Sequence, residues 1–126
     1  VDAPIERHPV HRTSMAVVER GKEARTHVLP VERFGAATLV RCTLDTGRTH
    51  QIRVHLAAIG HPLVGDPVYG ARRTATGVPA FARQALHAQR LAFVHPVTQC
   101  AISFASPLPA DFAALLDAMR ATSKQR

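Results

Sequence analysis

The densest group of chemically active side chains is the run GRTHQIRVH, residues 47–55, which combines arginine, histidine and glutamine. The pattern places this run where a strand gives way to a helix. On that helix His50 and Arg53 share one face, so both can point at one target. Arg48 comes just before the helix, where free backbone N–H groups favour an anion. The run is suited to holding a carboxylate or a phosphate, although the same residues would also form a solvated helix face.

Metal binding is not predicted from the histidines of this region. His50, His55 and His61 are separated by five and six residues. These spacings do not stack on one helix face, the sequence has no HExxH motif, and no carboxylate lies within the group. We therefore expect neither a metal nor another cofactor.

Cysteine and aspartate chemistry is also unsupported. Cys42 and Cys100 lie within apolar strand patterns without a CxxC pairing, which is typical of core cysteines in a reducing compartment. Asp45 in LDTG and Asp66 in GDPVYG are the only acids of the arginine-rich centre. Each stands beside a glycine or a proline, so both are interpreted as turn residues.

Composition points to a polyanionic partner. The 126 residues are 46% hydrophobic and carry a formal net charge of +7, with 16 Lys and Arg against nine Asp and Glu. Fourteen of the 16 are arginines, whose planar guanidinium suits bidentate phosphate contacts. Codon bias in a GC-rich genome also explains the preference for arginine, but not the surplus of positive charge. Membrane insertion is unsupported, since no apolar run approaches the ~20 residues of a spanning helix.

The hydrophobic pattern predicts an α+β fold with a largely antiparallel, mixed sheet, a central helix and a C-terminal helix. After an extended opening segment, residues 1–13, the predicted strands are 15–19, 24–34, 37–44, 63–64, 85–94 and 100–105. The third pairs with the second across Gly35, and Pro30 indicates an edge or bulge. The predicted helices are 49–59 and 110–121.

Both helices carry signals for their ends and their buried faces. For the first, Thr49 is predicted as N-cap, Gly60 as the C-terminal cap, and Ile52, Leu56 and Ile59 as the apolar stripe. For the second, the predicted packing face is Phe112, Leu115, Leu116 and Met119.

Two stretches together resemble a known family. LDTGRTHQIRVHLAAIGHPLVGDPVYG, residues 44–70, and RQALHAQRLAFVHPVT, residues 83–98, are similar to the C-terminal half of the catalytic domain of RluA-type RNA pseudouridine synthases. RHPVHRTSMAVVERGKEARTH, residues 7–27, resembles the RluD-like branch, which acts on large-subunit ribosomal RNA. The similarity covers nearly the whole chain. It implies that residues 1–126 are the C-terminal portion of such a domain and that the protein works on RNA in the cytoplasm.

The resemblance also implies roles for individual residues. Arg53 matches the arginine that pairs with the catalytic aspartate, and Leu86 matches the apolar residue that packs near the target base. Residues expected to contact RNA are Arg48, Thr49, His50, Gln51, Arg72, Arg73 and Arg83. A fixed guanidinium keeps a carboxylate ionised and aimed, and the target nucleotide has to leave its stack to be isomerised.

One departure from the family limits what the chain is expected to do alone. The family's catalytic aspartate stands in an upstream Arg-Leu-Asp segment that these 126 residues do not contain. Asp45 follows a leucine in a similar way, but it belongs to the arginine-bearing motif and is rejected as a substitute. We therefore expect no turnover from the isolated chain. The alternatives are a non-catalytic RNA-binding protein derived from the same fold, or an inert remnant whose open sheet edge promotes association.

Overall fold

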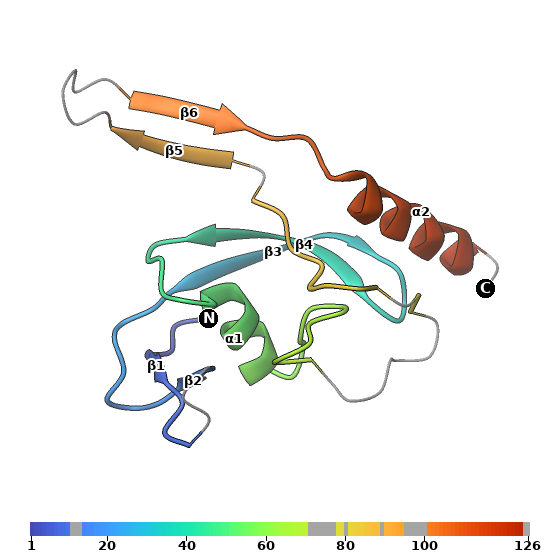
Figure 1. The fold of residues 1–126 in the computed structure, drawn as a ribbon. Helices are drawn as coiled ribbons and strands as arrows, with labels where there is room; N and C mark the ends of the chain where they lie inside the picture. Colours follow the sequence, from blue (N-terminus) through green and yellow to red (C-terminus); the bar gives the residue numbers. More distant parts are fainter. Residues whose placement is uncertain (11–13, 71–77, 80, 89, 95–100, 125–126) are drawn as a thin grey trace.

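The computed structural model describes residues 1–10, 14–70, 78–79, 81–88, 90–94 and 101–124 (Figure 1). The strands are β1 (Ile5–Arg7), β2 (Met15–Val17), β3 (Thr26–Arg33), β4 (Thr38–Leu44), β5 (Arg90–Val94) and β6 (Ala101–Ala105). The helices are α1 (Gln51–Ala58) and α2 (Ala110–Lys124). This composition confirms the predicted α+β class.

Among the described residues the strands pair antiparallel, β1 with β2, β3 with β4 and β5 with β6, which agrees with the predicted largely antiparallel strand arrangement. The β3–β4 pairing confirms the prediction in detail, with Gly35 in the turn at a φ of 88° and a register shift between Pro30 and Glu32. Proline cannot donate to the ladder, so an irregularity at that point is expected. Figure 1 shows α1 lying between this pair and the β1–β2 pair.

Helix α1 differs from its prediction at the start and on its buried face. The N-cap is His50, not Thr49, and it makes no side-chain capping bond. The predicted stripe is wrong at Ile59, which is 49% exposed, while Gln51 and His55 are buried. Apolar periodicity could not predict this face, because polar side chains on it are satisfied by hydrogen bonds.

The C-terminal end of α1 confirms the predicted Gly60 cap. Gly60 has a φ of 83°, and its N–H donates to the Ala57 carbonyl while His61 N–H donates to the Leu56 carbonyl. These two bonds form a Schellman motif, which stops the helix.

Two other predictions fail between α1 and β6. Residues 63–64 form no strand, and β5 begins at Arg90 instead of residue 85. Residues 85–87 are held in a loop by contacts across the chain, among them the bond from Ala85 N–H to the Val64 carbonyl. Residues 95–100, which connect β5 and β6, lie outside the described residues.

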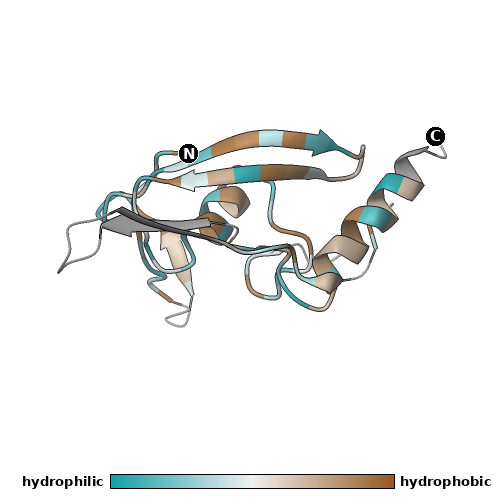
Figure 2. Cartoon of the chain, turned by 90° about the horizontal axis from the view of Figure 1, so that it is seen from above, coloured by the Kyte–Doolittle hydropathy of each residue, from teal (hydrophilic) through white to brown (hydrophobic). Residues whose placement is uncertain are grey.

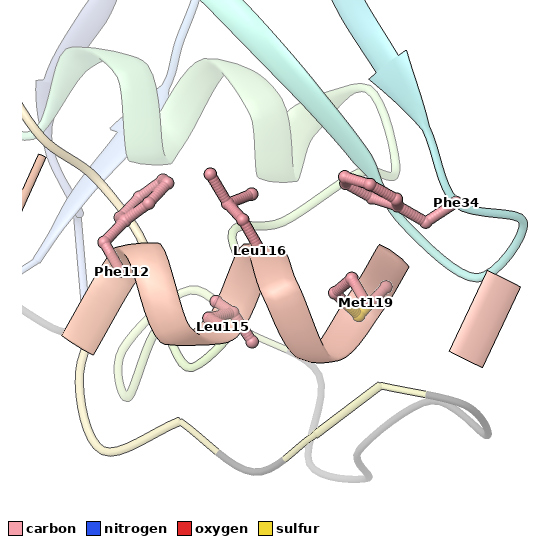
Figure 3. Close-up of a cluster of buried hydrophobic side chains, with 5 residues drawn as sticks. All are labelled: Phe34, Phe112, Leu115, Leu116 and Met119. Atoms are coloured by element: carbon pink, nitrogen blue, oxygen red, sulfur yellow. The ribbon is translucent and has the colours of Figure 1, made fainter. Parts of the chain in front are cut away.

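Helix α2 is amphipathic, with hydrophilic and hydrophobic residues along its length (Figure 2). Its predicted packing face is confirmed. The cluster in Figure 3 consists of Phe112, Leu115, Leu116 and Met119 from α2 and Phe34 from the β3–β4 turn. Val64, Val78, Phe81 and Ala85 pack around the cluster, so α2 also covers the loop that leads toward Leu86.

Replacing Phe112 with alanine should lower the free energy of unfolding by about 3–5 kcal/mol, since a buried aromatic side chain is lost and a cavity remains. Asp117→Ala on the same helix is the matched control, because that side chain is 78% exposed. Urea unfolding followed by circular dichroism measures both. Equal stability of the two variants would show that α2 does not depend on this cluster.

Candidate active site

A pocket of about 420 Å³ lies beside the first turn of α1. It gathers Arg48, His50, Gln51, Arg53 and Leu86, which the sequence had placed in or beside one site, although the last lies more than thirty positions from the others. The remaining lining residues are Leu44, Ile52 and Gln84. No lining residue is a carboxylate, so the described pocket wall is basic and apolar.

Arg53 is held by Asp66, a contact that the sequence did not predict. Its Nε donates to Asp66 Oδ2 and its Nη2 to Asp66 Oδ1, both at 2.9 Å. The Arg53 side chain is 10% exposed and that of Asp66 is not exposed. Two parallel bonds from a guanidinium to a carboxylate fix both planes. The sequence analysis expected Arg53 to pair with an aspartate that these 126 residues do not contain. In the structure, the edge of the guanidinium formed by Nε and Nη2 is instead bound to Asp66 of the same chain.

The other edge of the Arg53 guanidinium remains for a second partner. In the described part of the chain, no hydrogen bond involves Arg53 Nη1. The Tyr69 ring lies against the same group, with its centroid 5.1 Å from the guanidinium carbon. Arg53 is therefore fixed from two sides and can still offer N–H donors toward the pocket that it lines.

The loop HPLVGDPVYG shapes both of these contacts. Asp66 Oδ1 accepts bonds from the N–H groups of Val68 and Tyr69, at 3.0 and 3.1 Å, so the turn orients the carboxylate. Gly65 has a φ of 75°, and a Cβ there would overlap the Arg83 carbonyl oxygen. Only glycine allows this close approach to the segment that carries Leu86.

His50 enters the pocket from an unusual backbone position. Its φ of 54° is in the left-handed region, where few residues other than glycine are found. Its Nδ1 lies 2.8 Å from the Tyr69 hydroxyl, which accepts a 2.8 Å bond from the Met15 N–H. Tyr69 thus connects β2, His50 and Arg53.

Gln51 has a bracing role in the described structure. Its Oε1 accepts from the Thr46 hydroxyl and the Arg48 N–H, and its Nε2 donates to the Arg25 carbonyl and to Thr26 Oγ1. The amide is fully used in joining β3 to the start of α1. The RNA contact expected of this side chain stays a prediction, and Gln51 also lines the pocket.

His55 extends the same network below the pocket. It is completely buried, with Nε2 at 2.8 Å from the Ala3 carbonyl and Nδ1 at 2.8 Å from Thr26 Oγ1. The carbonyl accepts the Nε2 proton, so Nδ1 accepts the Thr26 hydroxyl proton. This core histidine belongs to the structure that supports the site.

Arg83 braces Leu86 instead of facing the pocket. Its Nε and Nη2 bond to the two carboxylate oxygens of Asp111 at 2.9 and 3.0 Å. Its Nη1 donates to the Gln84 and Leu86 carbonyls at 3.0 and 3.3 Å. The start of α2 therefore fixes the backbone on which Leu86 is placed.

The remaining predicted RNA contacts divide into two groups. Arg48 lines the pocket and donates from Nε to the Glu23 carbonyl at 2.7 Å, while Thr49 is exposed and does not line it. Arg72 and Arg73 lie outside the described residues. Within the described ranges, no group of three or more metal-ligating side chains is found, and no helix has the length and apolar character to cross a membrane.

The two aspartates interpreted as turn residues differ in setting. Asp45 is half-exposed and its Oδ2 lies 2.9 Å from His27 Nε2, so that hydrogen bond lowers the pKa of its carboxyl group. Burial by itself raises the pKa of Asp66, but the bonds from Arg53, Tyr69 and Val68 outweigh it and the net pKa is lowered. Asp66 is thus held as a carboxylate. The Cys42 thiol is half-buried and its pKa is raised by burial, which agrees with a packing role.

Acid should remove the stability that Asp66 supplies. A carboxyl group with a lowered pKa stabilises the fold fully above its unfolded pKa of about 4, and the contribution disappears as the pH falls through the folded value. The variant Arg53→Met with Asp66→Leu removes both charges and should lose less stability between pH 5 and about pH 3. Urea unfolding across that pH range measures the free energy of unfolding of the wild type and of the double variant. Parallel curves would show that the pair does not contribute to acid sensitivity.

The sequence and the fold of the chain are similar to those of known proteins. The sequence model described as RNA pseudouridylate synthase matches residues 1–58. Ribosomal large subunit pseudouridine synthase D of Nitrosomonas europaea is 59% identical over 124 residues, which are 95% of this chain and 36% of that protein. The protein of the same name from Pseudomonas aeruginosa is 51% identical over 129 residues, covering 95% of this chain and 40% of its own length.

A solved structure, human RNA pseudouridylate synthase domain containing 1, matches with a TM-score of 0.68 at 27% identity, over 96% of this chain and 58% of that one. The chain is thus similar, over nearly its whole length, to members of the RNA pseudouridylate synthase family. These matches agree with the resemblance to the RluD-like branch of the RluA-type enzymes that the sequence motifs indicated. The chain spans about two fifths of the length of these curated relatives.

Proposed function

We propose that the chain forms the C-terminal portion of the catalytic domain of a pseudouridine synthase acting on large-subunit ribosomal RNA. Its role there is to supply Arg53 and Leu86, together with a basic surface, to a site whose nucleophilic aspartate comes from another segment. The observation that carries this proposal is the geometry of Arg53. The guanidinium is buried, held rigidly by Asp66 through Nε and Nη2, and belongs to a residue that lines a pocket whose described lining contains no carboxylate.

The chemistry of the reaction explains why this arrangement is useful. Conversion of uridine to pseudouridine breaks the bond from the ribose to the base nitrogen and forms one to a base carbon. A carboxylate nucleophile has to remain ionised and aimed throughout. A guanidinium at hydrogen-bond distance lowers the carboxyl pKa and restricts its motion. Leu86 offers an apolar contact for the base after it leaves its stack.

Relatives of the chain make a direct test possible. In a chimera, this chain replaces the matching 124-residue stretch of the Nitrosomonas europaea protein. We expect the chimera to form pseudouridine in unmodified large-subunit ribosomal RNA, measured by mass spectrometry of nucleosides, and the chain alone to form none. Turnover by the chain alone, or a folded chimera without activity, would overturn the proposal.

The second candidate is an RNA-binding protein without catalysis, working in the same cytoplasmic setting. It is favoured by the net charge of +7 and by the absence of a carboxylate among the pocket-lining residues that the structure describes. Phosphate contacts make binding fall steeply with salt, by about 0.7 logarithmic units in affinity per contact and per tenfold increase in salt for single strands. Salt-sensitive RNA binding by a chimera that has no activity would favour this candidate over the first.

A further inference from the structure

The Tyr69 hydroxyl lies where it can set the proton arrangement of a pocket-lining histidine. Tyr69 Oη accepts the Met15 N–H at 2.8 Å, which fixes the oxygen against β2. Its second neighbour is His50 Nδ1, also at 2.8 Å. Among the described residues no other hydrogen-bond acceptor of the hydroxyl proton is found, so that proton is directed to Nδ1.

The consequence for His50 follows from the chemistry of imidazole. A neutral ring carries one proton, and when Nδ1 accepts a bond the proton is on Nε2. The side chain lines the pocket together with Arg53 and Leu86. His50 is therefore prepared to donate from Nε2.

The surrounding geometry shows that this arrangement is constrained. The His50 backbone has a φ of 54°, a conformation that is costly for a residue other than glycine. The rings of His50 and Tyr69 meet edge to face, with centroids 5.6 Å apart. The Tyr69 N–H also bonds to Asp66, and its ring contacts the Arg53 guanidinium. Tyr69 thus contacts both the His50 imidazole and the Arg53 guanidinium.

We propose that Tyr69 is a positioning residue that holds His50 in the form protonated on Nε2, so that His50 donates a hydrogen bond to an oxygen of the bound nucleotide. The nucleotide as ligand rests on the proposed function, whereas the protonation of His50 does not. A neutral donor suits a base carbonyl, since it binds oxygen without adding charge beside the guanidinium. The sequence motif GDPVYG thereby serves the site through both Asp66 and Tyr69.

The first experiment tests the protonation pattern in the chain itself. Two-bond nitrogen–proton correlation spectra distinguish a protonated Nε2 from a protonated Nδ1. The wild-type chain should show His50 as the Nε2-protonated form, and Tyr69→Phe, which keeps the ring against Arg53, should show a mixture of the two. A protonated Nδ1 in the wild type, or an unchanged spectrum in a folded Tyr69→Phe, would overturn the inference. This result does not depend on catalysis.

The second experiment uses the chimera and tests the donor. Asparagine tolerates the left-handed backbone but is too short to place a donor where Nε2 lies, whereas glutamine can reach it. We expect His50→Asn to lose about tenfold in kcat, the value of one hydrogen bond, and His50→Gln to recover part of it. Equal activity of the two variants would contradict a donor role. An inactive wild-type chimera would instead reject the proposed function and leave the spectra as the test of Tyr69.

Discussion

Replacing Asp66 with alanine is expected to lower the free energy of unfolding by about 3–5 kcal/mol, because the substitution leaves the Arg53 guanidinium buried without its partner. Asp66 is fully buried as a side chain and also accepts the N–H groups of Val68 and Tyr69. Its loss therefore affects the turn as well as the ion pair. Many domains have only about 5–15 kcal/mol of stability, so partial unfolding at 37 °C should accompany the change.

A paired substitution separates the burial of charge from the packing of the site. Arg53→Met with Asp66→Leu replaces the ion pair by apolar side chains and should lose less stability than Asp66→Ala, since both buried charges are removed together and the remaining loss is that of the acceptor for the Val68 and Tyr69 N–H groups. Urea unfolding at neutral pH measures both proteins. A cost below about 1 kcal/mol for Asp66→Ala would place the pair among exposed, weakly stabilising ion pairs and contradict the buried geometry.

The second large effect concerns activity. In the chimera, Arg53→Lys should reduce kcat on the order of 10²–10³-fold, the cost of losing a preorganised electrostatic contact at a reacting group. Lysine keeps the positive charge but is a single point donor, so it cannot bind Asp66 in two places and also face a second carboxylate. Pseudouridine formation in unmodified ribosomal RNA provides the measurement.

Two further variants control for indirect effects on that rate. Arg41→Lys changes an exposed arginine on β4 and should leave turnover unchanged. The double variant Arg53→Met with Asp66→Leu should be folded but inactive, which separates catalysis from stability. Near-wild-type turnover in Arg53→Lys would show that the reaction does not depend on the Arg53 guanidinium.

Much of the fold follows from local sequence signals. The β3–β4 pair could be predicted because Gly35 permits the turn and Pro30 marks the irregular position. The packing face of α2 follows from helical spacing, and Gly60 ends α1 through its positive φ. Each of these features depends on residues close together in the chain.

The failures have a common physical origin in contacts between distant residues. The buried face of α1 includes Gln51 and His55, whose polar groups are satisfied from β3 and from Ala3. Hydrophobic periodicity carries no information about such hydrogen-bond partners. The predicted strand at 63–64 failed because Gly65 bends the chain against the Arg83 backbone.

The site shows the same division. The sequence motifs predicted Arg53 and His50 as site residues, and in the structure both line the same pocket as Leu86. Asp66 was interpreted only as a turn residue, and Tyr69 was not singled out. A signal was present, since Asp66 is one of two acids among seven arginines between positions 41 and 90, and Tyr69 follows it by three positions. An isolated acid in such a basic segment is a candidate partner for a buried arginine.

The central claim is that Arg53, fixed on one edge by Asp66, offers its other edge to a carboxylate from outside these 126 residues. A crystal structure of the chimera tests it most directly. The account predicts a carboxylate oxygen at about 2.7–3.0 Å from Arg53 Nη1, with the bonds from Nε and Nη2 to Asp66 retained. A structure in which no second carboxylate reaches Arg53, or in which one displaces Asp66, would contradict it.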